Sequence, residues 1–156
     1  MRPGPVTRRL FRAPVFLYHW RLGWLLGHRF LLLVHIGRRT GRRHETVLEV
    51  MEYRASSREA VVMNAFGRDS GWRRNIEAGP GAAVIVGRDR FVAVHRVLDI
   101  DEAAAVVARY ERRNRFMAPI VRLGLRWLSG CAYDGSDGGR RRLVAQLPLI
   151  AFWPAP

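Results

Sequence analysis

The residues best suited to chemistry lie together in one short turn. This arginine turn consists of Gly37, Arg38, Arg39, Thr40 and Gly41, and two further arginines follow directly. Two glycines so close together permit a sharp bend, so we expect free backbone N–H groups, a hydroxyl and up to four guanidinium groups on one loop. Because guanidinium binds oxygen pairs, the loop suits an anion with several oxygens, above all a phosphate. The alternative is an ordinary solvated turn on a basic protein.

A second polar segment lies further along the chain. It reads WRRNIEAGP from Trp72 to Pro80 and predicts a short helix, with Asp69 or Ser70 as its N-cap and Gly-Pro as its end. A helix N-terminus preceded by glycines is a second place for an anion. We therefore expect Trp72, Arg73 and Asn75 to face the arginine turn across one groove.

The other reactive side chains form no familiar catalytic pattern. His35, His44 and His95 are scattered on predicted strands without partners, which favours structural or pocket roles over metal binding. There is no Gly-x-Ser-x-Gly motif, Cys131 is the only cysteine, and no dinucleotide fingerprint follows a strand. No catalytic residue is identified, so an enzyme of this kind would depend on a cofactor for its chemistry.

Composition limits the choice of partner. The 156 residues are 49% hydrophobic, enough for one domain with one core. The net charge is +14 and all 27 basic residues are arginine, which favours nucleic acid, anionic lipid or a polyanionic cofactor. The arginines cluster at turns with few interleaved aromatic residues, so we expect no nucleic-acid partner. A single cysteine is consistent with a cytoplasmic protein.

Patterning predicts a strand-rich domain that positions both polar segments. The predicted strands are 30–36, 44–54, 59–66, 82–86, 91–98 and 142–152, and the predicted helices are 72–78, 99–113 and 119–128, with a glycine-rich loop at 130–139. In the second strand Thr46, Leu48, Val50 and Glu52 share one face. Both faces of that strand mix polar and apolar residues, which indicates that one of them lines a cavity.

The N-terminal region differs from the rest. Residues 1–13 predict a loose basic arm, and residues 14–26 an amphipathic helix whose aromatic and arginine content suits a membrane interface. Packing on the barrel or on a second subunit explains the helix equally well. We therefore divide the chain into an arm and helix (1–29) and a core domain (30–156). The protein is predicted to be a monomer or homodimer in the cytoplasm, with peripheral contact to the inner face of the membrane through residues 14–29.

The strand that ends in GRRTGRR, followed by WRRNIEAGP, resembles the deazaflavin-dependent nitroreductase and quinone reductase family. The resemblance implies a mainly β (α+β) fold with flanking helices, a split β-barrel of the FMN-binding type. It also implies coenzyme F420, a two-electron hydride carrier with a phosphate and an oligoglutamate tail. The implied activity is an F420-dependent oxidoreductase that transfers a hydride to a quinone, a nitro compound or another unsaturated small molecule. The alternative is a split barrel that binds FMN, heme or lipid without reductase activity.

The same resemblance assigns cofactor contacts by position. The phosphate and tail of the cofactor would be held by Arg38, Arg39, Thr40, Gly41, Arg42 and Arg43, and the ring would lie along Thr46, Val47 and Leu48. The ring or ribityl chain would also be lined by Asn64, Ala65, Phe66 and Gly67. The other side of the site would be closed by Trp72, Arg73, Arg74 and Asn75. It assigns no metal site.

Overall fold

The computed structural model describes residues 27–65, 70–79, 81–130 and 133–156. The predicted arm, the predicted helix over 14–26 and the site candidates Phe66 and Gly67 lie outside these residues. None of the helices within the described ranges has the length and apolar character that a membrane-spanning helix needs.

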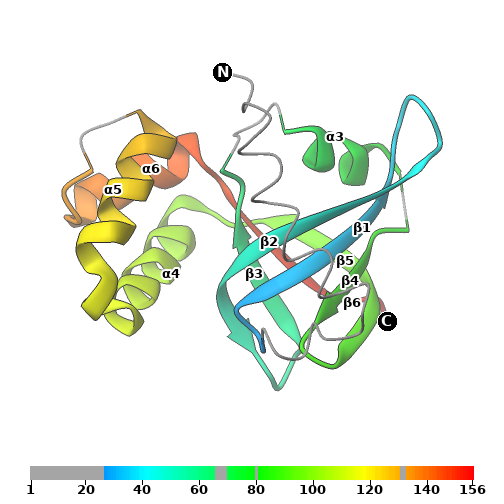
Figure 1. Ribbon diagram of the computed structural model, residues 1–156, viewed down its shortest axis with the longest axis horizontal. Helices are drawn as coiled ribbons and strands as arrows, with labels where there is room; N and C mark the ends of the chain where they lie inside the picture. Colours follow the sequence, from blue (N-terminus) through cyan, green and yellow to red (C-terminus); the bar gives the residue numbers. More distant parts are fainter. Residues whose placement is uncertain (1–26, 66–69, 80, 131–132) are drawn as a thin grey trace.

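Six antiparallel strands close into a barrel in the order β1-β2-β3-β6-β5-β4 (Figure 1). Their bounds are β1 Phe30–Ile36, β2 Arg43–Arg54, β3 Glu59–Met63, β4 Ala83–Val86, β5 Asp89–Val97 and β6 Leu149–Pro154. Each strand side chain alternates between the two faces, so Leu31 and Leu33 of β1 point into the barrel core with Val62 and Phe152. The predicted class, mainly β with flanking helices, is confirmed.

The helices of the described ranges occupy two places around the barrel (Figure 1). Their bounds are α3 Gly71–Ala78, α4 Ile100–Arg113, the 3₁₀ turn η3 Arg115–Met117, α5 Ala118–Ser129 and α6 Asp137–Gln146. Helix α3 lies beside the β1–β2 hairpin, whereas α4, α5 and α6 form a layer on the other side. Asp99 caps α4 as predicted, because its carboxylate accepts the Glu102 N–H at 2.8 Å.

The prediction of a strand over 142–152 is wrong in its first half, which belongs to α6. Ser136 caps this helix by accepting the Gly139 N–H at 3.0 Å. A Cβ atom at Gly139 would overlap the Asp134 carboxylate, so a side chain there would require that carboxylate to move. Leu143 and Leu147 then form a buried face one turn apart. The glycines that indicated a loop therefore lie in the first turn of a helix.

The prediction for the second strand is also wrong beyond Val50. A register shift between Val50 and Glu52 marks a β-bulge against β3. As a result Tyr53 packs against the same core cluster as Leu48 and Val50, while Met51 packs under α4 and α6. An extra residue in one strand inverts the alternation that follows it, and composition gives no sign of it.

A second core cluster joins the helical layer to the outer face of the barrel. Val106 and Val107 of α4 pack with Leu143 of α6 and Leu149 of β6, and all are fully or almost fully buried. At the edge of this cluster Glu111 accepts hydrogen bonds from the Tyr133 hydroxyl (2.5 Å) and from Arg140 (2.9 Å). The layer is therefore fixed to the barrel by burial and to itself by a partly buried ionic network.

Candidate functional site

The arginine turn is a tight loop at the tip of the β1–β2 hairpin. The Gly37 carbonyl accepts the N–H groups of Thr40 (3.2 Å) and Gly41 (2.8 Å), and the Gly37 N–H donates to the Arg42 carbonyl (2.8 Å). Gly41 has φ +63°, the left-handed conformation that favours glycine. Most backbone N–H groups of the turn are therefore hydrogen-bonded within the loop itself. The expectation of several free N–H groups is wrong, and the available donors are guanidinium groups.

Asn75 of α3 ties the arginine turn to the rest of the barrel. Its Oδ1 accepts the backbone N–H of Arg38 at 3.1 Å and the Arg38 guanidinium at 3.2 Å. The two residues come from separate parts of the sequence, so α3 sets the direction of the Arg38 side chain. The expectation that Asn75 faces the arginine turn is confirmed, and the same expectation is wrong for Trp72 and Arg73, which do not line the cleft beside the turn.

His35 in turn fixes the orientation of the Asn75 amide. The Asn75 Nδ2 lies 3.1 Å from His35 Nδ1, and His35 Nε2 lies 3.2 Å from the Thr46 hydroxyl. An amide N–H can only donate, so Nδ1 is the acceptor and the ring proton is on Nε2. The result is a chain of four groups, Thr46–His35–Asn75–Arg38, which we call the turn relay.

The turn relay requires a neutral imidazole. His35 is 4% exposed and continues the inward face of Leu31 and Leu33 to the mouth of the barrel. Burial, with a smaller contribution from the neighbouring His44, lowers the His35 pKa from 6.5 to about 4. The His35 and His44 rings are stacked with centroids 5.6 Å apart. Near neutral pH the ring therefore keeps the tautomer that orients Asn75.

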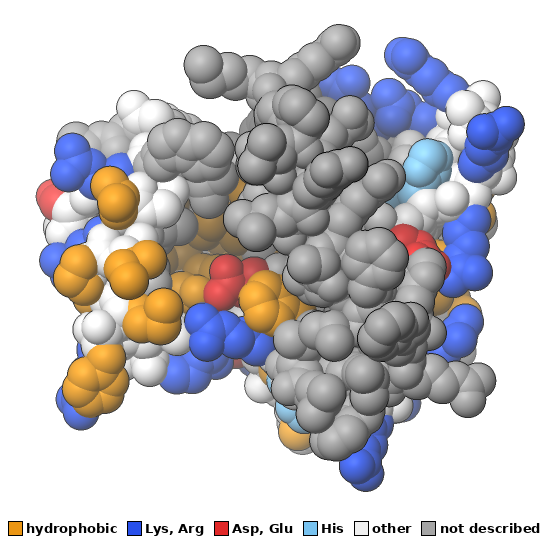
Figure 2. All heavy atoms as spheres, viewed as in Figure 1, with side chains coloured by type: hydrophobic (Ala, Val, Ile, Leu, Met, Phe, Trp, Pro, Cys, Tyr) orange, Lys and Arg blue, Asp and Glu red, His pale blue; other side chains and the backbone are white. Residues whose placement is uncertain are grey.

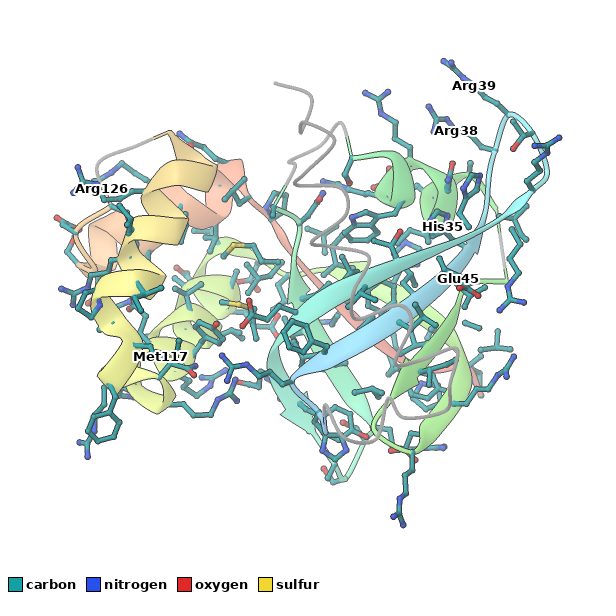
Figure 3. All side chains as sticks on the ribbon, in the orientation of Figure 1. His35, Arg38, Arg39, Glu45, Met117 and Arg126 are labelled. Carbon is teal, nitrogen blue, oxygen red and sulfur yellow. The ribbon has the colours of Figure 1, made fainter. Side chains whose placement is uncertain are left out.

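A cleft of about 340 Å³ opens between the arginine turn and α3 (Figure 3). Its walls are His35, Ile36, Gly37, Arg38, Gly41, Asn75, Ile76, Ala78, Gly79 and Ala82. Polar relay groups line both sides, His35 and Arg38 from β1 and the turn and Asn75 from α3, with apolar residues between them. This volume falls at the lower end of the range of small-molecule sites.

The four arginines of the turn and its flank differ in pairing. Arg43 forms an ion pair with Glu45 at 2.8 Å. Within the described part of the chain, the guanidinium groups of Arg39 and Arg42 have no acidic partner, and Arg38 is bound only to the neutral Asn75. Figure 3 shows Arg39 at the tip of the hairpin, pointing away from the barrel. Guanidinium groups without acidic partners, on the loop beside the cleft, favour an anionic ligand.

The predicted site residues on β2, and Trp72 of α3, lie in different parts of the barrel. Thr46 belongs to the turn relay, Leu48 packs on the barrel core, and Val47 packs with the residues of β1 and β4 on the opposite face. Trp72 is 6% exposed and lies near Phe152 in the core, so its side chain does not line the cleft.

The remaining candidates surround α3 and the end of β3. Asn64 is fully buried just after β3, with its N–H donated to the Pro148 carbonyl at 3.0 Å, and Ala65 follows it. Arg73 is paired with Glu77 at 2.7 Å. Arg74 is exposed on the same helix and does not line the cleft. The structure therefore gathers Arg38, Gly41 and Asn75 at the cleft and leaves the others around it.

Sequence reasoning left several cleft residues out of the site. His35 was expected to be a structural or pocket residue and proves to be both, while Ile76, Gly79 and Ala82 were not assigned to the site. The available signal for His35 was its position near the end of an apolar strand, two residues beyond a core leucine and two residues before Gly37.

Comparison with known proteins identifies the family. A model of the F420H(2)-dependent quinone reductases matches residues 21–122 of the 156. The chain belongs to this family. It is therefore an F420-dependent oxidoreductase, as the resemblance of the arginine turn and the α3 segment implied. Curated proteins gave no match.

Solved structures support the fold of this F420-dependent reductase. An F420-H2 dependent reductase (FDR-A) matches with TM-score 0.50 and 14% identity, over 81% of this chain and 96% of that chain. Atu2129 from Agrobacterium tumefaciens, of unknown function, gives TM-score 0.51 and 16% identity over 96% and 57%. The heme storage protein HutZ from Vibrio cholerae gives TM-score 0.50 and 12% identity over 90% and 91%. The split-barrel, FMN-binding-like fold is confirmed, and such low identities show the fold alone.

Proposed function

We propose that this chain transfers a hydride from reduced F420 to a quinone and holds the anionic end of the cofactor at the arginine turn. The observation that supports this most directly is the cleft beside the turn, where Arg38 is oriented by the turn relay and Arg39 and Arg42 have no acidic partner among the described residues. These cations fit the phosphate and oligoglutamate tail of F420. A quinone acceptor is consistent with the family, and a nitro compound or another unsaturated acceptor remains an alternative.

The residues of the chain would divide the task of binding. Arg38 approaches the phosphate from a fixed direction, because Asn75 holds both its backbone and its side chain. Arg39 and Arg42 supply charge for the phosphate or the tail. Arg43 and Arg73 are already paired with carboxylates, so we place them in a supporting role.

The reacting part of the site rests on fewer contacts. We propose that the ring lies beside Thr46, Val47 and Leu48, with Asn64, Ala65, Phe66 and Gly67 near the ring or ribityl chain. When bound, reduced F420 supplies a hydride, and a quinone becomes a quinol by taking that hydride and one proton. The chain's own task is to fix the cofactor and leave one ring face accessible. We assign no catalytic residue.

The setting of the reaction is also proposed. A quinone is a small lipid-soluble molecule, which is consistent with a protein that touches the inner face of the membrane through residues 14–29. We propose a cytoplasmic monomer or homodimer without a nucleic-acid partner. Heme is an alternative ligand because HutZ, a heme storage protein, shares the barrel, and FMN is a second alternative.

Titration with F420 distinguishes these ligands. We expect F420 to quench the fluorescence of the five tryptophans at low micromolar concentration, and FMN and heme to have little effect. A response to FMN or heme, with none to F420, would replace the proposed cofactor. Reduced F420 with a soluble quinone then tests the reaction, by the loss of reduced cofactor with time.

A charge-matched pair of variants tests the arginine turn. Arg39→Gln with Arg42→Gln lowers the net charge from +14 to +12. The control Arg58→Gln with Arg90→Gln does the same in the β2–β3 turn and in β5, where neither residue lines the cleft. Because a charge-assisted hydrogen bond contributes about 1.5–3 kcal/mol, we expect the first pair to weaken F420 binding at least about tenfold. The control should change it less than about threefold. Equal losses would show that only overall charge matters.

A further inference from the structure

An apolar surface on the helical layer has no partner among the described residues. It is formed by η3 and α5, and we call it the η3–α5 surface; its residues are Phe116, Met117, Ile120 and Leu123 with the flanking Arg115, Arg122 and Arg126. Phe116 is 86% exposed, Leu123 68% and Ile120 66%. Large apolar side chains in one patch mark an interaction surface, because moving each of them out of water lowers the free energy of the complex.

The apolar and basic side chains lie on neighbouring sides of one helix. Ile120 and Leu123 are three residues apart and share a face of α5. Arg122 and Arg126 are four residues apart and share the next face. Figure 2 shows hydrophobic side chains gathered on the outer side of the helical layer with arginines beside them, and Figure 3 places Met117 and Arg126 at opposite ends of α5. An apolar stripe flanked by arginine is the pattern of a helix that lies in a lipid interface.

The charge of the η3–α5 surface indicates which kind of partner would bind to it. Between Glu111 and Asp134 the chain has five arginines and no acidic residue. A second copy would bring the same arginines against each other, because a two-fold contact joins a surface to itself. An anionic bilayer offers what this surface lacks, phosphate groups beside the arginines and hydrocarbon beneath the apolar side chains.

We propose that the η3–α5 surface docks the protein on anionic lipid membranes. This surface is separate from residues 14–29, and the inference does not depend on the electron acceptor or on F420. Its contribution per arginine follows from the attraction of basic residues to the negative surface potential, and it weakens as salt is added.

Vesicle flotation of the full-length protein tests the proposal. Vesicles of phosphatidylcholine alone are compared with vesicles that also contain phosphatidylglycerol. We expect flotation with the anionic vesicles only, and a loss of about tenfold or more in apparent affinity for Ile120→Asn with Leu123→Asn. A matched control, Val92→Asn with Val97→Asn, removes two exposed apolar side chains from β5 and should bind like the wild type.

The charge is tested separately. Arg122→Gln with Arg126→Gln should weaken flotation, whereas Arg58→Gln with Arg90→Gln should not, at the same net charge of +12. All four positions of the two test pairs are exposed, so melting temperatures should stay close to wild type. Equal binding by test and control variants would overturn the proposal. So would a dimer, seen by sedimentation without lipid, that the Ile120 and Leu123 changes dissociate.

Discussion

Protonation of His35 should destabilise the fold well before acid affects most carboxylates. The ring is buried at the mouth of the barrel, and its Nδ1 accepts from the Asn75 amide. A proton on Nδ1 would place two donors against each other and add a charge to a site that already contains Arg38 and His44. The native state therefore resists a proton that the unfolded chain accepts readily.

The size of the effect follows from the His35 pKa. The pKa is 6.5 in the unfolded reference and about 4 in the folded protein. Between these values the unfolded state binds more protons, so the free energy of unfolding falls as the pH falls. The whole difference is ~3 kcal/mol, since one pKa unit corresponds to about 1.36 kcal/mol. About 2 kcal/mol of it should be lost between pH 7 and pH 5.

Urea unfolding of wild type and His35→Gln at both pH values measures this term. Glutamine does not titrate, so the variant should lose about 2 kcal/mol less than the wild type over the interval, whatever its stability at pH 7. His28→Gln, at an exposed position, is the control for removing a histidine and should follow the wild-type profile. Parallel profiles for wild type and His35→Gln would refute the buried neutral imidazole, as would an NMR titration of His35 with a midpoint near 6.5.

Two further substitutions test the contacts of the site and of the helical layer. Asn75→Leu removes the acceptor for both Arg38 donors, so F420 affinity should fall about tenfold while a circular dichroism melt remains cooperative; unchanged affinity would separate Arg38 from the cofactor. Glu111→Gln should lower the free energy of unfolding by about 1–3 kcal/mol, because its pair with Arg140 is mostly buried. Arg141→Gln removes one partner of the Arg141–Asp101 pair, in which both side chains are exposed, and should cost less than about 0.5 kcal/mol; an equal cost would show that burial does not set the strength of these pairs.

The parts of the fold that depend on interactions between neighbouring residues in the sequence were predicted correctly. The apolar run of β1, the glycines of the arginine turn and the Asp99 cap of α4 each act within a few residues, and each was placed correctly. The family likeness depended on the same local features. Local chemistry therefore gave most of the strands and the position of the turn.

The errors arise where the local structure is determined by a contact with another part of the chain. In α6 the Asp134 carboxylate occupies the space that a Gly139 side chain would need, and the helix then buries Leu143 against α4. In β2 the bulge is fixed by pairing with β3. The role of His35 depends on Asn75, forty positions away in the chain. None of these partners is visible in a local pattern.

The two basic surfaces of the molecule differ in what surrounds their arginines, and this difference separates their tasks. At the arginine turn, Arg38 is held by a neutral amide beside a cleft, an arrangement that fixes one anion in one orientation. On the η3–α5 surface the arginines flank exposed apolar side chains, an arrangement that suits a broad interface without fixed geometry. Figure 1 places the hairpin tip and α5 on opposite sides of the molecule. A protein docked through α5 would therefore keep the arginine turn in water, where a soluble anionic cofactor can reach it.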